Sequence, residues 1–410
     1  MKEIPLDVLV IGGGAAGMGA AIKAKENGAE RVGIVEINNE LSGVLNQCLH
    51  PGFGVHYFRE IMTGPEYGTR LQQKVKDLGI ETYTSTFIIR VKPDIIALSR
   101  SGVCKFIPKA IVFATGCRER HRGALKIPGT RPAGVFTAGQ AQTLMDVYGY
   151  IPGKSVVILG SGDIGLIMAR RFAMLGYEVK AVVEIMQYPG GLARNVQQCL
   201  YDFGIPLYLS HTITRIFGNE RVEGVTIQKV DSQNRPIPGT ESQIACDTVI
   251  LSVGLIPETH LLEELGAEID PRTRGSVVNE YMETTVPGVF AAGNLVLVFD
   301  LVDKATICGE IAGKNAALCA RGELPRPSKW IRIVSGKNVR HLIPQLVSGS
   351  NTVNVYLRAT HPIEKAILKI GSLNIKKEHV RPIEVIEQRV PLSVFEGIQN
   401  ELKIDIEEVS

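Results

Sequence analysis

A pattern of strand, glycines, helix, strand and acid occurs twice in this chain, and no other feature limits its possible folds as strongly. The first copy runs from the apolar stretch at 8–11 into GGGAAG at 12–17, and its second apolar stretch ends at Glu36. The second copy runs from 156–159 into GSGDIG at 160–165 and ends at Glu184. Since 148 residues separate both the glycines and the acids, the two copies are in register, which chance turns would not be.

The needs of a dinucleotide site explain each position of the pattern. The first glycine makes a tight turn, the second lets the backbone approach a pyrophosphate, and the third lets helix and strand pack closely. The helix N-terminus then offers N–H groups and a positive dipole end to the phosphates. The acid accepts hydrogen bonds from a ribose hydroxyl. The sequence therefore predicts an α/β protein with two Rossmann-like domains.

The acid of the second copy also bears on cofactor choice. A carboxylate at Glu184 would repel a 2′-phosphate, and no arginine directly follows it in the stretch 184–187. This favours NAD over NADP. Arg194 is near enough in sequence to leave the other choice open.

Length and composition exclude several classes of protein. A chain of 410 residues is long enough for two or three domains. A net charge of +3 and a single tryptophan give no nucleic-acid surface. We expect no signal peptide, because Met1-Lys2-Glu3 leads directly into a strand, and no apolar run is long enough for a transmembrane span. Seven scattered cysteines without a CxxC pair indicate reduced thiols, so the cytoplasm is the expected location.

Three later segments give the chain a family resemblance. They read FATG at 113–116, LSVG at 251–254 and VPGVFAAGN at 286–294. With the paired glycine motifs, the chain resembles the two-dinucleotide-binding flavoproteins, the superfamily of glutathione and thioredoxin reductases. The resemblance implies FAD at the first motif and NAD(H) at the second. The family has Gly-Asp where this chain has Gly293-Asn294, so an uncharged amide would meet the flavin ribitol. The following helix, about 305–319, would point its N-terminus at the flavin pyrimidine ring.

The resemblance also implies a division of the chain and a set of cofactor-binding residues. A split FAD domain would cover 1–118 and 285–326, an NAD domain 119–284, and a small β-rich domain 327–410. The expected FAD-binding residues are Gly12, Gly14, Ala16, Gly17, Glu36, Gly43, Gln47, Phe87, Thr115, Gly116, Gly293, Asn294 and Ala305. The expected NAD-binding residues are Gly160, Gly162, Asp163, Ile164, Gly165, Glu184 and Gly254.

The chain departs from the disulfide reductases after Glu36. Those enzymes carry two cysteines where this chain has Leu45 and His50, so dithiol chemistry is not expected. Cys48 stands alone between these positions, and its thiol either lines the flavin pocket or acts as a peroxidatic cysteine. His50 is a packing residue or a general base.

The segment at 43–67 has a closer match. Its GVLNQCLH, GFGVHYF and TGPEY stretches resemble the FAD/NAD oxidoreductases found beside anaerobic glycerol-3-phosphate dehydrogenases. They are similar, more distantly, to the flavin subunits of opine, sarcosine and proline dehydrogenases. This resemblance implies an FAD-dependent NAD(H) oxidoreductase that exchanges electrons with a partner flavoprotein dehydrogenase. The alternatives are a stand-alone NADH oxidase or peroxidase using Cys48 and a nucleotide-sensing scaffold. Assembly into a homo-oligomer is also left open.

Overall fold

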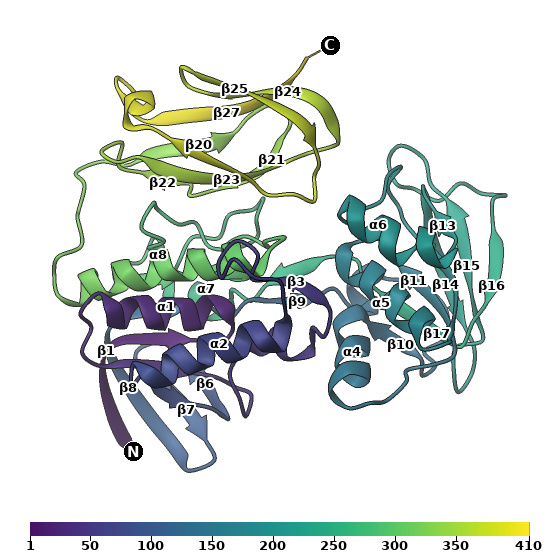
Figure 1. Ribbon diagram of the computed structural model, residues 1–410, viewed down its shortest axis with the longest axis horizontal. Helices are drawn as coiled ribbons and strands as arrows, with labels where there is room; N and C mark the ends of the chain where they lie inside the picture. The colour runs from purple at the N-terminus through teal and green to yellow at the C-terminus, as the bar shows by residue number, and fades with distance from the viewer. Residues whose placement is uncertain (410) are drawn as a thin grey trace. The chain divides into compact units, whose positions relative to one another are not determined.

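The computed structural model describes residues 1–409, and the chain divides into two compact units. One unit contains residues 1–117 and the chain from residue 257 onward, and the other contains residues 118–256. Figure 1 shows the elements of each unit. None of the helices in the described part of the chain is both long and apolar enough to cross a membrane.

A seven-stranded sheet forms the centre of the first unit. Its strands lie in the order β5-β2-β1-β8-β7-β6, and β19 also pairs with β8. The strands are β1 (Lys2–Ile11), β2 (Val32–Val35), β5 (Glu81–Tyr83), β6 (Thr86–Arg90), β7 (Ile95–Ser99), β8 (Gly102–Phe113) and β19 (Val289–Ala291). β1, β2, β5, β8 and β19 run parallel to one another. Buried parallel strands read as continuous apolar runs, which is why Val8, Leu9 and Val10 are fully buried.

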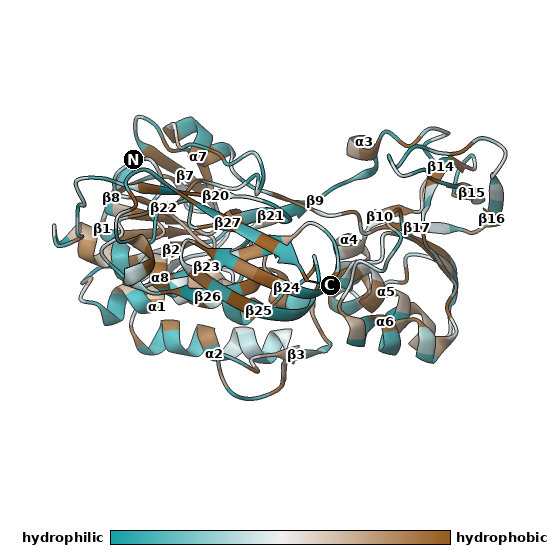
Figure 2. Ribbon diagram, turned by 90° about the horizontal axis from the view of Figure 1, so that it is seen from above, coloured by the Kyte–Doolittle hydropathy of each residue, from teal (hydrophilic) through white to brown (hydrophobic). Residues whose placement is uncertain are grey.

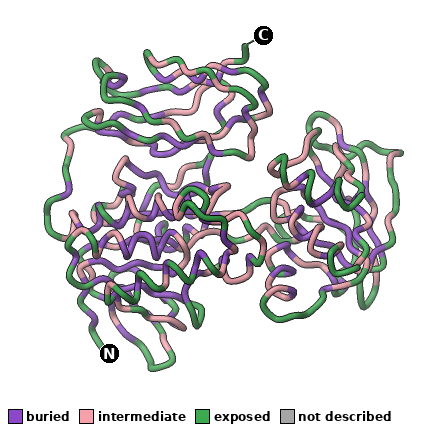
Figure 3. The backbone as a smooth tube through the Cα atoms, viewed as in Figure 1, coloured by how far each residue is buried: buried purple, intermediate pink, exposed green. Residues whose placement is uncertain are grey.

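Two helices pack closely beside this sheet because small residues line their contact. They are α1 (Ala15–Glu26) and α8 (Val302–Ala320). A Cβ atom on Gly309 or Gly313 would collide with the carbonyl oxygen of Ala16 or Ala20, respectively. Glycine at these positions therefore lets the two backbones touch. Figure 3 shows the buried turns of both helices.

The rest of the first unit's α/β part is built from short elements. Helix α2 (Gly64–Asp77) begins at a capping box between Thr63 and Glu66. The other elements are η1 (Gly43–Gln47), β3 (Pro51–Phe53), β4 (Met62–Thr63), α7 (His260–Leu265) and η4 (Gly293–Leu295).

The second unit has three layers, which confirms the predicted α/β class with Rossmann-like sheets. A parallel sheet in the order β10-β17-β11-β12-β13 lies between helices and an antiparallel sheet in the order β14-β15-β16. Neighbouring residues Val157 and Ile158 belong to the cores on opposite faces, as strand alternation requires. The parallel strands are β10 (Val135–Thr137), β11 (Ser155–Leu159), β12 (Glu178–Val183), β13 (Leu207–Tyr208) and β17 (Thr248–Leu251).

Shorter elements complete the second unit and its ends. The antiparallel strands are β14 (His211–Phe217), β15 (Gly224–Lys229) and β16 (Ser242–Ala245). The helices are α3 (Arg122–Leu125), α4 (Ala138–Gln142), η2 (Thr143–Val147), α5 (Asp163–Met174), α6 (Ala193–Cys199) and η3 (Tyr201–Phe203). A separate pair of strands consists of β9 (Cys117–Glu119) and β18 (Leu255–Pro257).

The C-terminal region is made of strands around a core of its own. Its sheets have the orders β22-β20-β27-β24-β25 and β21-β23-β26. The elements are β20 (Ile331–Ser335), β21 (Val339–Ile343), β22 (Leu346–Val347), β23 (Val353–Ala359), β24 (Ile363–Ile370), β25 (Leu373–Val380), β26 (Ile386–Val390), η5 (Leu392–Phe395) and β27 (Glu401–Glu408). Figure 2 shows the hydrophilic and hydrophobic residues alternating along β24 and β27, so one face of each strand is buried.

The C-terminal strands hold the segment that leads into α8. The guanidinium of Arg358 on β23 donates to Val298 O at 2.8 Å. The Phe299 ring meets the Tyr356 ring edge-on, with centroids 5.8 Å apart. Val385 N donates to the Asp300 carboxylate at 3.1 Å. The C-terminal strands and the start of α8 are therefore one packed structure.

The return to the first unit comes earlier than the predicted boundary at 284/285. Residues from 257 onward pack with the first unit, and Leu261 and Leu262 of α7 join its core. The Glu264 carboxylate accepts from the N–H groups of Val91 and Lys92, each at 3.3 Å. The sequence motif at 286–294 contains strand β19. The chain has already rejoined the first unit about thirty residues before this strand, at residue 257.

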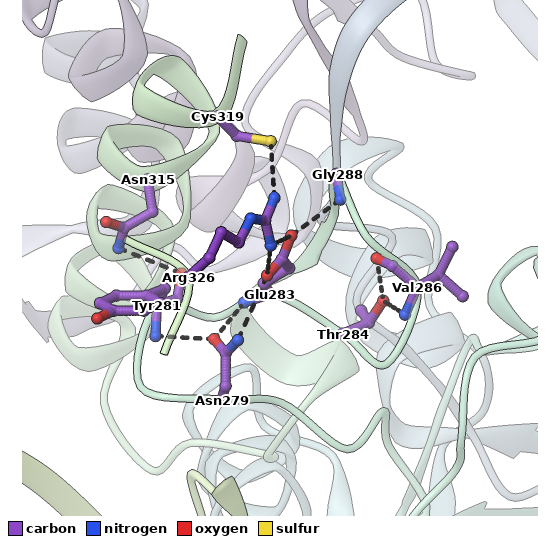
Figure 4. Close-up of polar contacts among 9 residues, drawn as sticks. All are labelled: Asn279, Tyr281, Glu283, Thr284, Val286, Gly288, Asn315, Cys319 and Arg326. Carbon is purple, nitrogen blue, oxygen red and sulfur yellow. Dashed lines mark hydrogen bonds and ion pairs between the residues drawn. The ribbon is translucent and has the colours of Figure 1, made fainter. Parts of the chain in front are cut away.

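An ion pair fixes the segment before β19 to the segment that follows α8 (Figure 4). The buried Glu283 carboxylate accepts two hydrogen bonds from Arg326, at 2.7 and 2.8 Å. It also accepts from Gly288 N at 2.9 Å. Asn279 Oδ1 accepts from the N–H groups of Tyr281 and Glu283, which holds the turn that carries the acid.

Removing the arginine is expected to destabilise this unit. Arg326→Ala leaves the buried Glu283 charge without its cation, which costs about 2–4 kcal/mol of unfolding free energy. Chemical denaturation followed by circular dichroism measures the loss. Lys369→Ala, which breaks an exposed pair with Glu407, is the control and should cost under about 1 kcal/mol. Equal losses in the two variants would contradict a structural role for the Glu283 pair.

Candidate functional site

The first glycine turn lies where β1 ends and α1 begins. Gly12 has a φ of +105°, and a Cβ there would collide with Ala114 O, so the protein itself requires glycine. A Cβ on Gly17 would strike Gly12 O. Gly14 differs, because no described atom lies within 4 Å of the position its Cβ would take. The space in front of Gly14 is thus open to a ligand, as a pyrophosphate requires.

The Glu36 carboxylate closes the same turn. It is buried and accepts from Gly13 N at 2.7 Å. Its other oxygen accepts from the N–H and the amide group of Asn38, at 2.9 and 2.8 Å. Because a carboxylate has about four acceptor positions, one remains for a ribose hydroxyl.

Most of the other predicted FAD residues come together around this turn. Ser42 pairs with Gly14, and a Cβ on Gly43 would lie 3.5 Å from the Gly14 Cα. A Cβ on Gly293 would come within 2.6 Å of the Ala16 Cβ. Ala114 N donates to Ile11 O at 2.8 Å, which brings the turn with Thr115 and Gly116 to the end of β1. Ala305 is buried in α8, and Gln47 ends η1.

The structure adds the exposure of Phe87 and the hydrogen-bond partners of Asn294, neither of which the sequence shows. Thr86 N donates to Glu36 O at 2.9 Å, while the next side chain, Phe87, is half exposed on β6. The Asn294 Oδ1 atom accepts from Phe299 N at 3.0 Å, so this amide holds the loop before α8. Its Nδ2 lies 3.7 Å from the sulfur of Cys117. Sequence reasoning missed this thiol, although it directly follows the FATG turn.

Cys48 and His50 lie on the segment between η1 and β3. The Cys48 thiol is buried and donates to Val44 O at 3.2 Å. Gly64, the first residue of α2, packs on it, since a Cβ at Gly64 would lie 2.7 Å from the Cys48 Cβ. The His50 ring contacts the Phe53 ring and places Nδ1 3.2 Å from Pro51 O.

A polar cluster on α8 was also missed. The Tyr57 hydroxyl donates to Glu310 at 2.6 Å, and its N–H donates to the buried Asp303 carboxylate at 2.9 Å. Burial, and then the Glu310 carboxylate, raise the pKa of Tyr57 well above its usual value. The Tyr67 hydroxyl bonds Thr306 at 2.7 Å. The 52–67 segment is therefore fixed to α8. The only sequence signal for these contacts is the group of aromatic residues in the segment.

The second glycine turn repeats the first one inside the other unit. Gly160 has a φ of +98°, and its Cβ would collide with Ser252 O. A Cβ on Gly165 would lie 2.6 Å from Gly160 O. Gly162 is open, with Ser252 Oγ as the nearest described atom, 3.9 Å from its Cβ position. The three glycines repeat the geometry of Gly12, Gly17 and Gly14, each 148 residues earlier.

The acid of the second copy repeats the geometry of Glu36. The buried Glu184 carboxylate accepts from Ser161 N at 2.8 Å and from Met186 N at 2.9 Å. Ser161 and Met186 correspond to Gly13 and Asn38. Ser161 adds a hydroxyl bond to Glu184 at 2.6 Å, which has no counterpart at Gly13.

The Asp163 carboxylate bonds the loop that follows β12. Its carboxylate accepts from Leu192 N at 2.8 Å and from the Asn195 amide at 2.7 Å, which ties the 190–195 segment to the start of α5. Ile164 follows in the first turn of α5, and Gly254 has a φ of +99° in the turn after β17. The backbone N–H groups of this turn suit a phosphate, and the contact of Asp163 with the dinucleotide stays a prediction.

Both turns fit a dinucleotide. Each combines an open second glycine, a helix N-terminus and a buried acid that keeps acceptor capacity. Within residues 1–409, no three metal-ligating side chains come together, and all seven cysteines are thiols.

Comparisons with known proteins agree with this geometry. A protein of Agrobacterium tumefaciens (strain Ach5), named as one of the subunits of opine oxidase, is 26% identical over 78% of this chain and 66% of its own length. The NAD(P)H coenzyme A polysulfide/persulfide reductase of Pyrococcus horikoshii is 29% identical over 70% of this chain and 62% of its own length. The chain thus spans slightly under two thirds of these relatives. The structure of T. acidophilum thioredoxin reductase matches with a TM-score of 0.63 and 24% identity, covering 78% of this chain and 99% of that one.

A family model for pyridine nucleotide-disulphide oxidoreductases matches residues 6–309. The match confirms the predicted enzyme class and the predicted cofactor pair, FAD with a nicotinamide dinucleotide. The repeated glycine turns, the two buried acids and this match lead to one conclusion: the chain belongs to the pyridine nucleotide-disulphide oxidoreductase family.

Proposed function

We propose that this protein is an electron-transfer subunit that exchanges electrons between NAD(H) and a partner flavoprotein dehydrogenase. The observation that carries the proposal is the replacement of the redox cysteines. Two residues stand where the family resemblance implies the redox cysteines of disulfide reductases. One is Leu45, which is fully buried, and the other is His50, whose ring contacts Phe53. Electrons reaching the flavin therefore have no intramolecular dithiol to enter, and a protein partner is the natural acceptor or donor.

The chain's own residues bind and orient the cofactors in this proposal. FAD, when bound, exchanges a hydride with the nicotinamide and passes the two electrons on. The Gly14 turn, Glu36 and the α8 N-terminus hold FAD, while the Gly162 turn and Glu184 hold NAD(H). The Agrobacterium relative is one of the subunits of opine oxidase by its name, which supports a complex. The resemblance of the 43–67 segment favours a partner of the glycerol-3-phosphate dehydrogenase type.

Co-purification tests the proposal. The tagged chain, recovered from its native host, should bring down a second flavoprotein in about equal amount. The substrate of that partner, added anaerobically with NAD⁺, should then produce NADH. Recovery of the chain alone, together with rapid NADH turnover on oxygen or peroxide, would contradict the subunit role. Reduction of an artificial dye by NADH separates an enzyme of either kind from a nucleotide-sensing scaffold.

NADH is expected to reduce the flavin at least about tenfold more efficiently than NADPH. The buried Glu184 carboxylate would repel a 2′-phosphate and accept a hydrogen bond from a 2′-hydroxyl, and a charged hydrogen bond contributes about 1.5–3 kcal/mol. Anaerobic stopped-flow reduction with each nucleotide gives the ratio. Equal efficiency would contradict the assignment of NAD to this site.

Cys48→Ser is expected to leave reduction of the flavin by NADH within about twofold of the parent rate. The thiol donates to a local carbonyl, a bond that a serine hydroxyl can also make, and hydride passes directly between the two rings. Stopped-flow reduction and peroxide turnover are measured side by side, with Cys104→Ser as the control thiol. A selective loss of peroxide turnover in Cys48→Ser would support the peroxidase alternative instead.

A further inference from the structure

A cavity of about 330 Å³ opens in the second unit, within residues 118–256. It is lined by His121, Arg122, Gly123, Arg131, Pro132, Val135, Phe136, Thr137, Gln140 and Leu251. Thr137 and Leu251 end strands β10 and β17, so the cavity lies at the carboxyl edge of the parallel sheet. The glycine turn follows β11, on the other side of β17, and Glu184 lies one strand farther away. The cavity is therefore a neighbour of the dinucleotide site rather than part of its glycine turn.

The lining is cationic. Arg122 and Arg131 contribute to it, and of the ten described residues that line the cavity none is acidic. Burial, and then the nearby Arg131, lower the pKa of Arg122. Two guanidinium groups held near each other without a carboxylate are relieved by a bound anion. Glu119, close by in sequence, uses its carboxylate to accept from Gly139 N at 2.8 Å.

The neutral polar residues of the lining present donors. His121 Nδ1 accepts from Gly123 N at 3.1 Å, so the neutral ring carries its proton on Nε2. Gln140 Oε1 accepts from Thr137 N at 3.1 Å, which leaves the amide NH₂ group to donate. Thr137 Oγ1 accepts from Gln140 N at 3.4 Å, which leaves the hydroxyl proton. Each of these three acceptors is used by a backbone N–H. Among the arginines, the Nη2 of Arg122 also donates to Ile127 O and Pro128 O, at 3.4 and 3.3 Å, and its other N–H groups remain for a ligand.

We infer that this cavity binds a small phosphate ester. Guanidinium groups bind phosphate oxygens in pairs, and a phosphate offers enough acceptors for two arginines and three neutral donors. Val135, Phe136 and Leu251 provide an apolar wall for the organic part of the ligand. The cavity lies at the ends of β10 and β17 rather than at the glycine turn after β11, which separates this ligand from the dinucleotide phosphates. The inference goes beyond the proposed function and does not depend on it.

Isothermal titration of the FAD-loaded full chain with phenyl phosphate tests the inference. One equivalent should bind saturably, inorganic phosphate should bind more weakly, and phenol should not bind. Saturating NADH should leave the phenyl phosphate site available. Arg131→Gln should weaken binding about tenfold or more, because a charged hydrogen-bond donor is lost. Lys126→Gln is the matched control, since it removes a charge from the same segment outside the lining and should change affinity less than about twofold.

Several results would overturn the inference. One is the absence of saturable binding up to about 10 mM phenyl phosphate, beyond the range of specific small-ligand binding. Complete competition by NADH would assign the phosphate to the dinucleotide site. If Lys126→Gln weakened phenyl phosphate binding as much as Arg131→Gln, the loss would reflect the net charge of the segment rather than contacts inside the cavity. Equal affinity for inorganic and phenyl phosphate would identify free phosphate as the ligand. Circular dichroism and flavin content show that Arg131→Gln is folded, and Arg131→Lys, which keeps the charge but not the paired donors, should bind with intermediate affinity.

Discussion

Gly14→Leu is expected to give a folded protein that purifies without FAD. Gly14 has an ordinary φ of −74°, and no described atom lies within 4 Å of its Cβ position, so the protein can accept the larger side chain. The leucine would instead fill the space of the pyrophosphate. Losing two charge-assisted hydrogen bonds from backbone N–H groups costs about 3–6 kcal/mol, or roughly a 10²- to 10⁴-fold loss of affinity.

The measurement is the ratio of flavin to protein after denaturation, with circular dichroism as the check on folding. The expected product is colourless and keeps the parent's far-ultraviolet spectrum. A yellow Gly14→Leu protein with one FAD per chain would place the flavin elsewhere.

Gly162→Leu is expected to show the opposite behaviour: full flavin and almost no reduction by NADH. Gly162 also has an ordinary φ, −65°, and its nearest described neighbour would be 3.9 Å from the Cβ. The substituted side chain again occupies the phosphate approach, now in the second unit. The NADH concentration for half-maximal flavin reduction should rise roughly 10²- to 10⁴-fold, for the same loss of hydrogen bonds.

Anaerobic stopped-flow spectroscopy follows the flavin bleaching directly. Dithionite reduction of the same sample shows that its flavin is intact. Gly14→Leu and Gly162→Leu are each other's control, because each places one leucine in an equivalent turn. Loss of flavin from Gly162→Leu would point to misfolding, whereas normal NADH reduction of Gly162→Leu would remove NAD(H) from the second turn.

The glycine turns could be predicted because their constraints are local. Gly12 and Gly160 are required by a positive φ and by one nearby carbonyl oxygen, both set by the strand–turn–helix connection itself. Glu36 and Glu184 could be predicted as well, because each directly follows the second strand of its motif. The Rossmann-like sheets could also be anticipated, since each copy of the repeated pattern defines two of their strands.

Contacts between distant segments could not be predicted in this way. The sequence around Tyr57 does not indicate that its hydrogen-bond partner is Glu310, 253 residues later. Nor does the sequence around Asn294 indicate that its side chain accepts a hydrogen bond from Phe299 in the same loop. Similarly, Asp163 looks like a ligand residue in the motif, and only the folded loop shows it bonding Leu192. The boundary at 257 depends on which hydrophobic core Leu261 and Leu262 pack into. Two apolar residues would be buried equally well in either core, so the sequence does not indicate which one they join.

The contacts of the C-terminal strands with Val298, Phe299 and Asp300 link two properties that are usually measured separately. Those three residues lead into α8, the helix proposed to hold FAD, so in that proposal the strands and the cofactor act on the same few peptide groups. A ligand that binds only the folded arrangement stabilises everything packed with it. With FAD bound as proposed, flavin binding and the unfolding of the C-terminal strands are coupled reactions, and we expect a substitution in β23 that does not contact the cofactor to change how tightly the cofactor is held.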